Sequence, residues 1–484
     1  MKRSYTPVPP DRDPKVLGIF TRDKSFYRTF FPLLFVIVLQ QLAALAVNLA
    51  DNIMLGSYAE SAMSGVALVN QIQFLLQMVI VGVGEGVVIL GSRFWGRKTL
   101  EPIKDVVSIG LKCGFLIAAV TWAVVFFFPE QVFSLLSKDP AEVAAACSYA
   151  KIVCFTYFFF AVTTVLLASL RSVETVAIGF VDSCIALVVN VGLNYVLIFG
   201  KFGAPRLGEV GAAWATFTAR AVELLVVIVY LIFFDKKIRI TLKSLISFKT
   251  DLFKTYIKTS IPMVGSGFFW GAAMFIQAAI LGHLQTAADG VSVIAANSVA
   301  TTVFSIVSVF SYGAANATSV LIGKTIGEGK KHKLKEYAVT LQLLFLLIGI
   351  VAGAVLFFSR YAILSIYDIT EKTRELADAL ICVLSVTIVG TSYQVACLTG
   401  IVRGAGDTKF VLVNDLIFMW LLVLPVSFAA AFWLNLSPVV VFICLKSDQI
   451  LKCIVAAVKV NRFRGIDNVD KYVKLEAAEA AETE

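Results

Sequence analysis

PLLFVIVLQQLAALAVNLADNIMLG, residues 32–56, is apolar over most of its length and long enough to cross a membrane as one helix. Near its end it carries one full carboxylate, Asp51. A carboxylate near the bilayer centre costs about 2.5 to 3.5 kcal/mol on insertion scales. We therefore expect Asp51 to have a partner or a function.

The rest of the chain repeats this pattern. Hydrophobic residues make up 58% of the 484 residues and charged residues 15%, which indicates a polytopic membrane protein. The apolar runs lack the alternating polar pattern of a barrel strand, so we predict an all-α fold. Twelve transmembrane helices are expected, near residues 30–56, 66–92, 106–128, 147–169, 176–199, 210–234, 259–282, 291–320, 337–358, 378–402, 410–433 and 437–459.

Lysine and arginine predict the orientation. They concentrate in the segments that share a side with the amino terminus, among them 93–104, 236–258 and 324–335. Cytoplasmic loops carry such an excess, so both termini are predicted to be cytoplasmic, in the cell membrane. The same bias accounts for the formal charge of +9, and no nucleic-acid partner is expected.

An internal repeat divides the chain. IMLG (53–56) is matched by AILG (279–282), and LGSRFWGRK (90–98) by LIGKTIGEGK (321–330), at offsets between 226 and 233 residues. Six spans per half predict two six-helix bundles related by a pseudo-twofold axis along the membrane normal, as in transporters that carry substrate between their halves. The predicted parts are a cytoplasmic tail (1–29), an N-terminal bundle (30–234), a cytoplasmic linker (235–258), a C-terminal bundle (259–460) and a cytoplasmic tail (461–484).

Five stretches in order resemble the multidrug and toxic compound extrusion (MATE) family of efflux transporters. The resemblance covers roughly residues 25 to 465. The stretches are VNLADNIMLG (47–56), SRFWG (92–96), NVGLNYVLIFG (190–200), GEVGAAWAT (208–216) and RGAGDTK (403–409).

We expect a monomer in membrane lipid that needs no cofactor, and the resemblance implies an antiporter. Such proteins export small cationic or amphipathic organic compounds, drugs and toxins, in exchange for inward protons or sodium, by rocking two bundles. A flippase for lipid-linked oligosaccharides or other lipids is the alternative, although its cavity should carry several cations. An enzyme is not expected, because no catalytic motif is visible, and two histidines in the chain make a zinc or haem site improbable.

A polar cluster is predicted in the outer half of the N-terminal bundle. Asp51 and Asn194 lie at similar depth, and Asn190 shares a helix face with Asn194 as Asn48 does with Asp51. Thr216 enters the same level from the sixth span. Oxygen ligands at Asp51, Asn190 and Asn194 suit Na⁺, and a desolvated carboxylate suits a proton. Many family members carry aspartate where this chain has Asn194, so Asp51 is the sole acid and we favour H⁺.

The cluster has an alternative interpretation, in which its polar groups only hold helices together. The repeat tests this idea, because symmetric packing groups should recur in both halves. Asp51 aligns with Gln277, and Asn190 and Asn194 align with Val423 and Ser427. The acid and its amides therefore belong to one bundle only, which favours a function in ion coupling.

Further polar residues are candidates for the substrate cavity. They are Glu85, its repeat counterpart Asn316, Gln277 and Tyr393. For Glu85, a paired structural acid is the alternative.

Other charges are expected to form structural pairs. Asp182 and Asp415 occupy equivalent positions and are expected to pair with Arg171 and Arg403. Spacings of three and four residues predict the local pairs Arg220 with Glu223 and Asp448 with Lys452.

Overall fold

The structure is a computed structural model that describes residues 20–58, 60–137, 139–241, 244, 250–284, 292–365, 367 and 369–462. Residues 1–19 of the predicted N-terminal tail, 242–243 and 245–249 of the predicted linker, and 463–484 of the predicted C-terminal tail lie outside the described residues.

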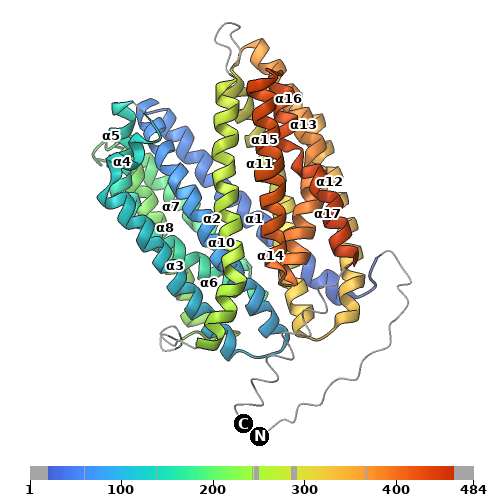
Figure 1. Cartoon of the computed structure of the whole chain (residues 1–484). Helices are drawn as coiled ribbons and strands as arrows, with labels where there is room; N and C mark the ends of the chain where they lie inside the picture. The colour runs from blue at the N-terminus through green and yellow to red at the C-terminus, as the bar shows by residue number, and fades with distance from the viewer. Residues whose placement is uncertain are drawn as a thin grey trace.

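All regular elements of the described ranges are helices, in agreement with the predicted fold class. They form two lobes, one from each half of the chain (Figure 1). The N-terminal lobe contains α1 (Lys24–Gly56), α2 (Glu60–Gly96), α3 (Glu101–Phe127), α4 (Pro129–Ser134), α5 (Pro140–Val153), α6 (Thr156–Ser172), α7 (Ala177–Phe199), and α8 (Glu209–Val229) with its continuation η1 (Tyr230–Phe234).

The C-terminal lobe has longer helices and several π-helical stretches. It contains α10 (Thr250–His283), α11 (Val293–Gly327), α12 (Lys331–Leu364), α13 (Glu371–Val395) with η2 (Ala396–Val402), α14 (Thr408–Asp415) with η3 (Leu416–Val423), α15 (Leu424–Phe428) and η4 (Ala429–Trp433), α16 (Pro438–Lys446) and α17 (Asp448–Arg462).

The helices account for the predicted spans. Ten of them are long and apolar enough to cross a membrane, and the bent pair α5 and α6 can form an eleventh span. The last predicted span, 437–459, is occupied by α16 and α17, which are separated by Ser447 alone. This arrangement is consistent with twelve crossings.

Local signals begin and end several of these helices. The Asp23 carboxylate accepts a hydrogen bond from the Ser25 amide and caps α1, and Asp139 caps α5 in the same way through Ala141. Gly200 ends α7 with a φ of 66°, a left-handed conformation that glycine adopts without steric cost.

Some helices extend beyond the predicted spans. The seventh span was expected from residue 259 but α10 begins at Thr250, and the eighth was expected to end at 320 but α11 continues to Gly327. Hydropathy detects only the part of a helix that lies in hydrocarbon, so polar turns at either end escape it. The predicted fourth span, 147–169, is bent by 53° between α5 and α6.

The two lobes meet along α2, which packs against α10 and α11, while α1 packs against α11 (Figure 1). At one end, two glycines let the backbones of α2 and α11 approach closely: a Cβ on Gly96 would lie 2.3 Å from the Lys324 carbonyl oxygen, and one on Gly327 would lie 2.1 Å from that of Arg93. We call this end of the molecule, where Gly96 and Gly327 meet, the joined end. Away from it the lobes lean apart (Figure 1).

Candidate functional site

The predicted acid–amide cluster is assembled between α1 and α7. The Asn194 amide nitrogen donates a short hydrogen bond to Asp51 Oδ1 and a second bond, of 3.1 Å, to Asn190 Oδ1. Asn190 is 1% exposed, Asn194 is fully buried and Asp51 is partly buried. The spacing of four residues on α7 thus places both amides on the face that α1 covers, as expected.

The surroundings of the cluster differ in part from the prediction. Thr216 is buried, but its hydroxyl lies 3.5 Å from that of Tyr149 on α5, and no hydrogen bond to Asp51 is found among the described residues. Asn48 is exposed on α1, outside the bonded cluster. A depth estimate cannot tell which side of a helix faces its neighbour, and here α1 turns Asp51 inward and Asn48 outward.

Arg220 is a neighbour of the cluster, whereas its spacing in the sequence predicted only the local pair with Glu223. Its guanidinium bonds Glu223 at 2.8 Å, as predicted, and lies within electrostatic range of Asp51. The signal for its position was present in the sequence, because Arg220 follows Thr216 by four residues and therefore shares its helix face.

Glu85 joins the two lobes. Its carboxylate is 4% exposed and bonds Arg171 of the N-terminal lobe at 2.5 Å and Arg403 of the C-terminal lobe at 2.8 Å. Glu85 is therefore a paired acid, in agreement with the alternative given for it. Its contact with Arg403 can exist only while the joined end is closed.

Two further polar links cross between the lobes at the joined end. Lys324 of α11 bonds Glu174 at 2.7 Å. Asp23, at the start of α1, accepts hydrogen bonds from Lys333 and, at 2.7 Å, from Tyr337 of α12. The bonds from Lys333 and Tyr337 lower the pKa of the Asp23 carboxyl to about 2.

The expected pairing of Asp182 and Asp415 with Arg171 and Arg403 is wrong. Both arginines bind Glu85 instead, because the packing of α2 against the other lobe brings its carboxylate between them. Asp182 is 2% exposed and has no ion pair among the described residues.

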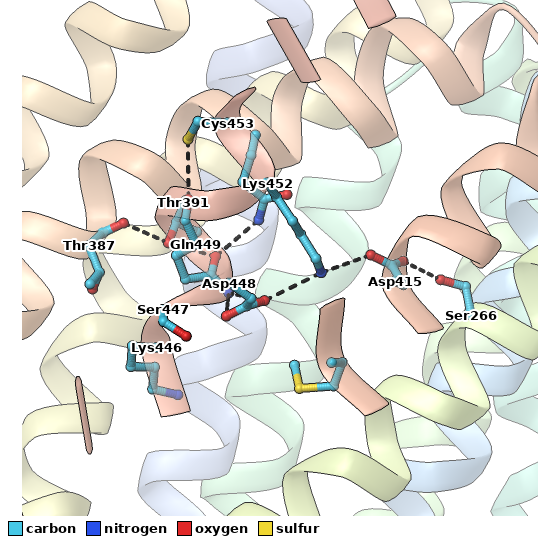
Figure 2. Close-up of polar contacts among 12 residues, drawn as sticks. Ser266, Thr387, Thr391, Asp415, Lys446, Ser447, Asp448, Gln449, Lys452 and Cys453 are labelled. Carbon is cyan, nitrogen blue, oxygen red and sulfur yellow. Dashed lines mark hydrogen bonds and ion pairs between the residues drawn. The ribbon is translucent and has the colours of Figure 1, made fainter. Parts of the chain in front are cut away.

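Asp415 lies in a separate network of the C-terminal lobe. Its carboxylate bonds Lys452 at 3.0 Å and accepts from Ser266 at 2.8 Å. Lys452 also bonds Asp448 at 3.3 Å, so the predicted local pair is present (Figure 2). Figure 2 shows the lysine extending between the two carboxylates, which compensate its charge inside the lobe.

The candidate cavity residues have separate partners, and no hydrogen bond or ion pair among the four is found in the described part of the chain. Glu85 lies at the joined end, whereas Gln277 of α10 bonds Met419 and, at 3.4 Å, Lys446. The Tyr393 hydroxyl donates to Gln342 at 2.7 Å within the C-terminal lobe. Asn316 lies partly buried on α11. The four residues were predicted because each has a polar side chain within a membrane span. Polarity alone does not show that they line the same cavity.

Two helical lobes from two halves of one membrane-spanning chain, closed at one end and apart at the other, are the architecture of a membrane transporter. The MatE family model matches residues 36–196 and 262–429, which is more than half of the chain. The protein therefore belongs to the MATE family of efflux transporters, as the five sequence stretches predicted.

Known relatives match over most of the chain. The protein is similar to the uncharacterized transporter YisQ of Bacillus subtilis (strain 168), with 24% identity over 431 residues, 88% of this chain and 92% of YisQ. It is 27% identical over 410 residues to the probable multidrug resistance protein NorM of Photorhabdus laumondii, covering 82% of this chain and 86% of NorM. These matches favour multidrug efflux over the flippase alternative, and family members are transporters and not enzymes.

Solved structures share the fold. A crystal structure of MATE in the straight conformation matches with a TM-score of 0.80 at 18% identity, over 93% of this chain and 97% of that one. The eukaryotic MATE transporter AtDTX14 matches with a TM-score of 0.80 at 18% identity, over 92% and 98% of the two chains. At this identity the likeness describes the fold alone.

Proposed function

We propose that the protein is a proton-coupled antiporter that exports small cationic or amphipathic organic compounds, and that Asp51 is its coupling group. The observation that carries the proposal is the bond from the buried amide of Asn194 to the Asp51 carboxylate. An acid held between helices can bind and release a proton, and each change alters how α1 packs against α7.

Proton coupling is favoured over sodium coupling by the ligands present. Sodium is dehydrated when it binds and needs several oxygen ligands, preferably with more than one carboxylate. The bonded cluster offers one carboxylate, Asp51, and the Asn190 and Asn194 amides, and Thr216 bonds elsewhere. A proton needs a single group. On loading, Asp51 loses its charge and one of its oxygens becomes an O–H donor, which weakens its present bond from the Asn194 amide.

The asymmetry between the lobes supports a function over simple helix packing. Gln277 and Ser427, the repeat counterparts of Asp51 and Asn194, are both buried, and Gln277 bonds Met419 and Lys446. In the described part of the chain, the C-terminal lobe thus has no copy of the acid–amide cluster. If the cluster only packed helices together, the repeat predicts a copy at the equivalent position of that lobe.

The proposed orientation puts the joined end in the cytoplasm, because the basic loops and both termini are predicted on that side. In this arrangement Glu85 with Arg171 and Arg403 closes the cytoplasmic side, and the diverging end faces outward. The protein would then sit in the cell membrane as a monomer, ready to release a compound and to load a proton at Asp51.

The test is transport by the purified protein in sodium-free liposomes. A pH jump should drive exchange of a fluorescent organic cation in the natural protein, and Asp51→Asn should abolish it while membrane insertion is kept. Asp139→Asn is the matched control, since Asp139 only caps α5 and asparagine caps equally well. Strict dependence on sodium at fixed pH, or full export by Asp51→Asn, would refute the proposal.

A further inference from the structure

Asp182 is a second acid inside the N-terminal lobe, separate from the Asp51 cluster. It lies on α7 and is 2% exposed, and its Oδ1 atom has no hydrogen-bond partner among the described residues. Buried carboxylates are normally paired or hydrogen-bonded. The expected partner, Arg171, is bound to Glu85.

The charges around Asp182 do not balance. Arg220 of α8 lies within electrostatic range of three carboxylates, Glu223, Asp51 and Asp182. Its guanidinium is hydrogen-bonded to Glu223. The single positive charge of Arg220 is therefore paired with Glu223, and Asp51 and Asp182 are left without a cation of their own. Asp51 has its bond from Asn194, whereas Asp182 has no corresponding donor in the described ranges.

An unpaired ionised carboxylate in this position is costly. The penalty for burying such a charge amounts to several kcal/mol even after relaxation. The groups that face Asp182 offset this penalty only in part. From α8, the attraction of Arg220 is opposed by the like charge of Glu223, and near Asp182 the packed helix α1 places the uncharged amide of Gln40 against Gly179. A bound proton removes the charge and supplies the carboxyl with an O–H group.

The position of Asp182 relates it to the coupling group. It lies twelve residues before Asn194 on α7, which corresponds to about 18 Å along the helix axis, toward the joined end. On α8, which runs antiparallel to α7, Arg220 and Glu223 follow Thr216 by four and seven residues. The charged side chains therefore descend through the lobe from Asp51, past Arg220 and Glu223, to Asp182.

We propose that Asp182 is a second proton-binding site, from which the proton leaves toward the joined end. This inference rests on the proposed proton coupling at Asp51. In one cycle a proton from the diverging side binds the Asp51 carboxylate, and the Asp182 carboxyl releases its own proton once the joined end opens. The proton on Asp51 then passes through the Glu223 carboxylate to Asp182, which restores the starting state of all three acids. One proton moves inward, and only O–H bonds form and break.

Infrared spectroscopy tests the protonation directly. A carboxylic acid has a C=O stretch that a carboxylate lacks. At neutral pH, Asp182→Asn should remove one acid C=O band from the spectrum of the natural protein, and Asp182→Glu should move it. The matched control is Asp415→Asn at the equivalent position of the other lobe, where the carboxylate forms an ion pair with Lys452 at 3.0 Å. That substitution should remove only carboxylate bands.

Transport assays test whether Asp182 takes part in proton coupling. In sodium-free liposomes, Asp182→Asn should lower pH-driven export more than tenfold, while exchange of internal for external compound without a pH gradient stays within twofold. Asp182→Glu should restore pH-driven export, and it keeps the test decisive if the asparagine variant fails to insert.

The outcomes separate this inference from the proposed function. Loss of proton-driven export in the Asp51→Asn variant but not in the Asp182→Asn variant would overturn the inference alone, as would an acid band that Asp182→Asn leaves unchanged. Equal loss of driven export and of exchange in Asp182→Asn would show a structural role and would also overturn it. A natural protein without pH-driven transport would instead refute the proton coupling itself.

Discussion

Replacement of Glu85 by glutamine should release the joined end. The substitution keeps the shape of the side chain but removes the charge that Arg171 and Arg403 share. The bond to Arg171 lies within one lobe, so its loss destabilises both conformations alike. The bond to Arg403 crosses between the lobes, so its loss destabilises only the closed joined end.

The size of the effect follows from that single bond. A hydrogen bond between charged groups contributes about 1.5 to 3 kcal/mol. Because about 1.4 kcal/mol is a factor of ten, Glu85→Gln should shift the ratio of closed to open joined ends by about 10- to 150-fold. The contacts at Gly96, Gly327 and Lys324 remain, so the lobes should still close part of the time.

Spin labels at Thr99 and Glu328, exposed residues on opposite lobes beside the joined end, would measure this shift by pulsed electron resonance in a cysteine-free background. Glu85→Gln should populate a longer distance between the labels. Glu371→Gln is the control, because Glu371 forms an exposed pair with Arg374 within one helix. An unchanged distance distribution in Glu85→Gln, or the same change in the control, would refute the assignment of Glu85 as a seal.

Two further predictions follow from the lobes. Asn190→Ala should lower transport much more than Ser427→Ala in the same liposome assay, because only Asn190 belongs to the acid–amide cluster; equal losses would favour a packing role for both. The link of Asp23 to Lys333 and Tyr337 should depend on pH. Since the folded pKa of Asp23, about 2, lies below its ordinary value of 3.8, the link contributes its full stability above about pH 4 and loses it as the pH falls toward 2. Thermal unfolding of Asp23→Asn should therefore show a smaller loss of stability over this pH range than the natural protein, and identical curves would contradict the assignment.

Part of the candidate site could be predicted because the depth of a residue in the membrane depends on how far it lies from the end of its span in the sequence. Asp51 and Asn194 were placed at one level by counting residues from the ends of their spans, and the structure bonds them. The same counting placed Asn48 and Thr216 at this level, yet neither is bonded to Asp51 among the described residues. Depth says nothing of the direction in which a side chain points across the lobe.

The sequence by itself determined the order of the membrane spans, the division into two lobes and the family. These properties depend on hydrophobicity, on the 3.6-residue period of a helix and on an internal repeat, all of which are local or linear. Sequence spacing also predicted the local pairs Arg220 with Glu223 and Asp448 with Lys452, but only the tertiary structure decided which charges meet between helices. Arg171 and Arg403 lie in equivalent positions of the repeat, and symmetry assigned one acid to each, but the packing of α2 against the other lobe gives both to Glu85. Asp415 then bonds Lys452, while Asp182 is left without an ionic partner in the described chain, because ion pairing depends on how helices from distant parts of the chain rotate and approach one another.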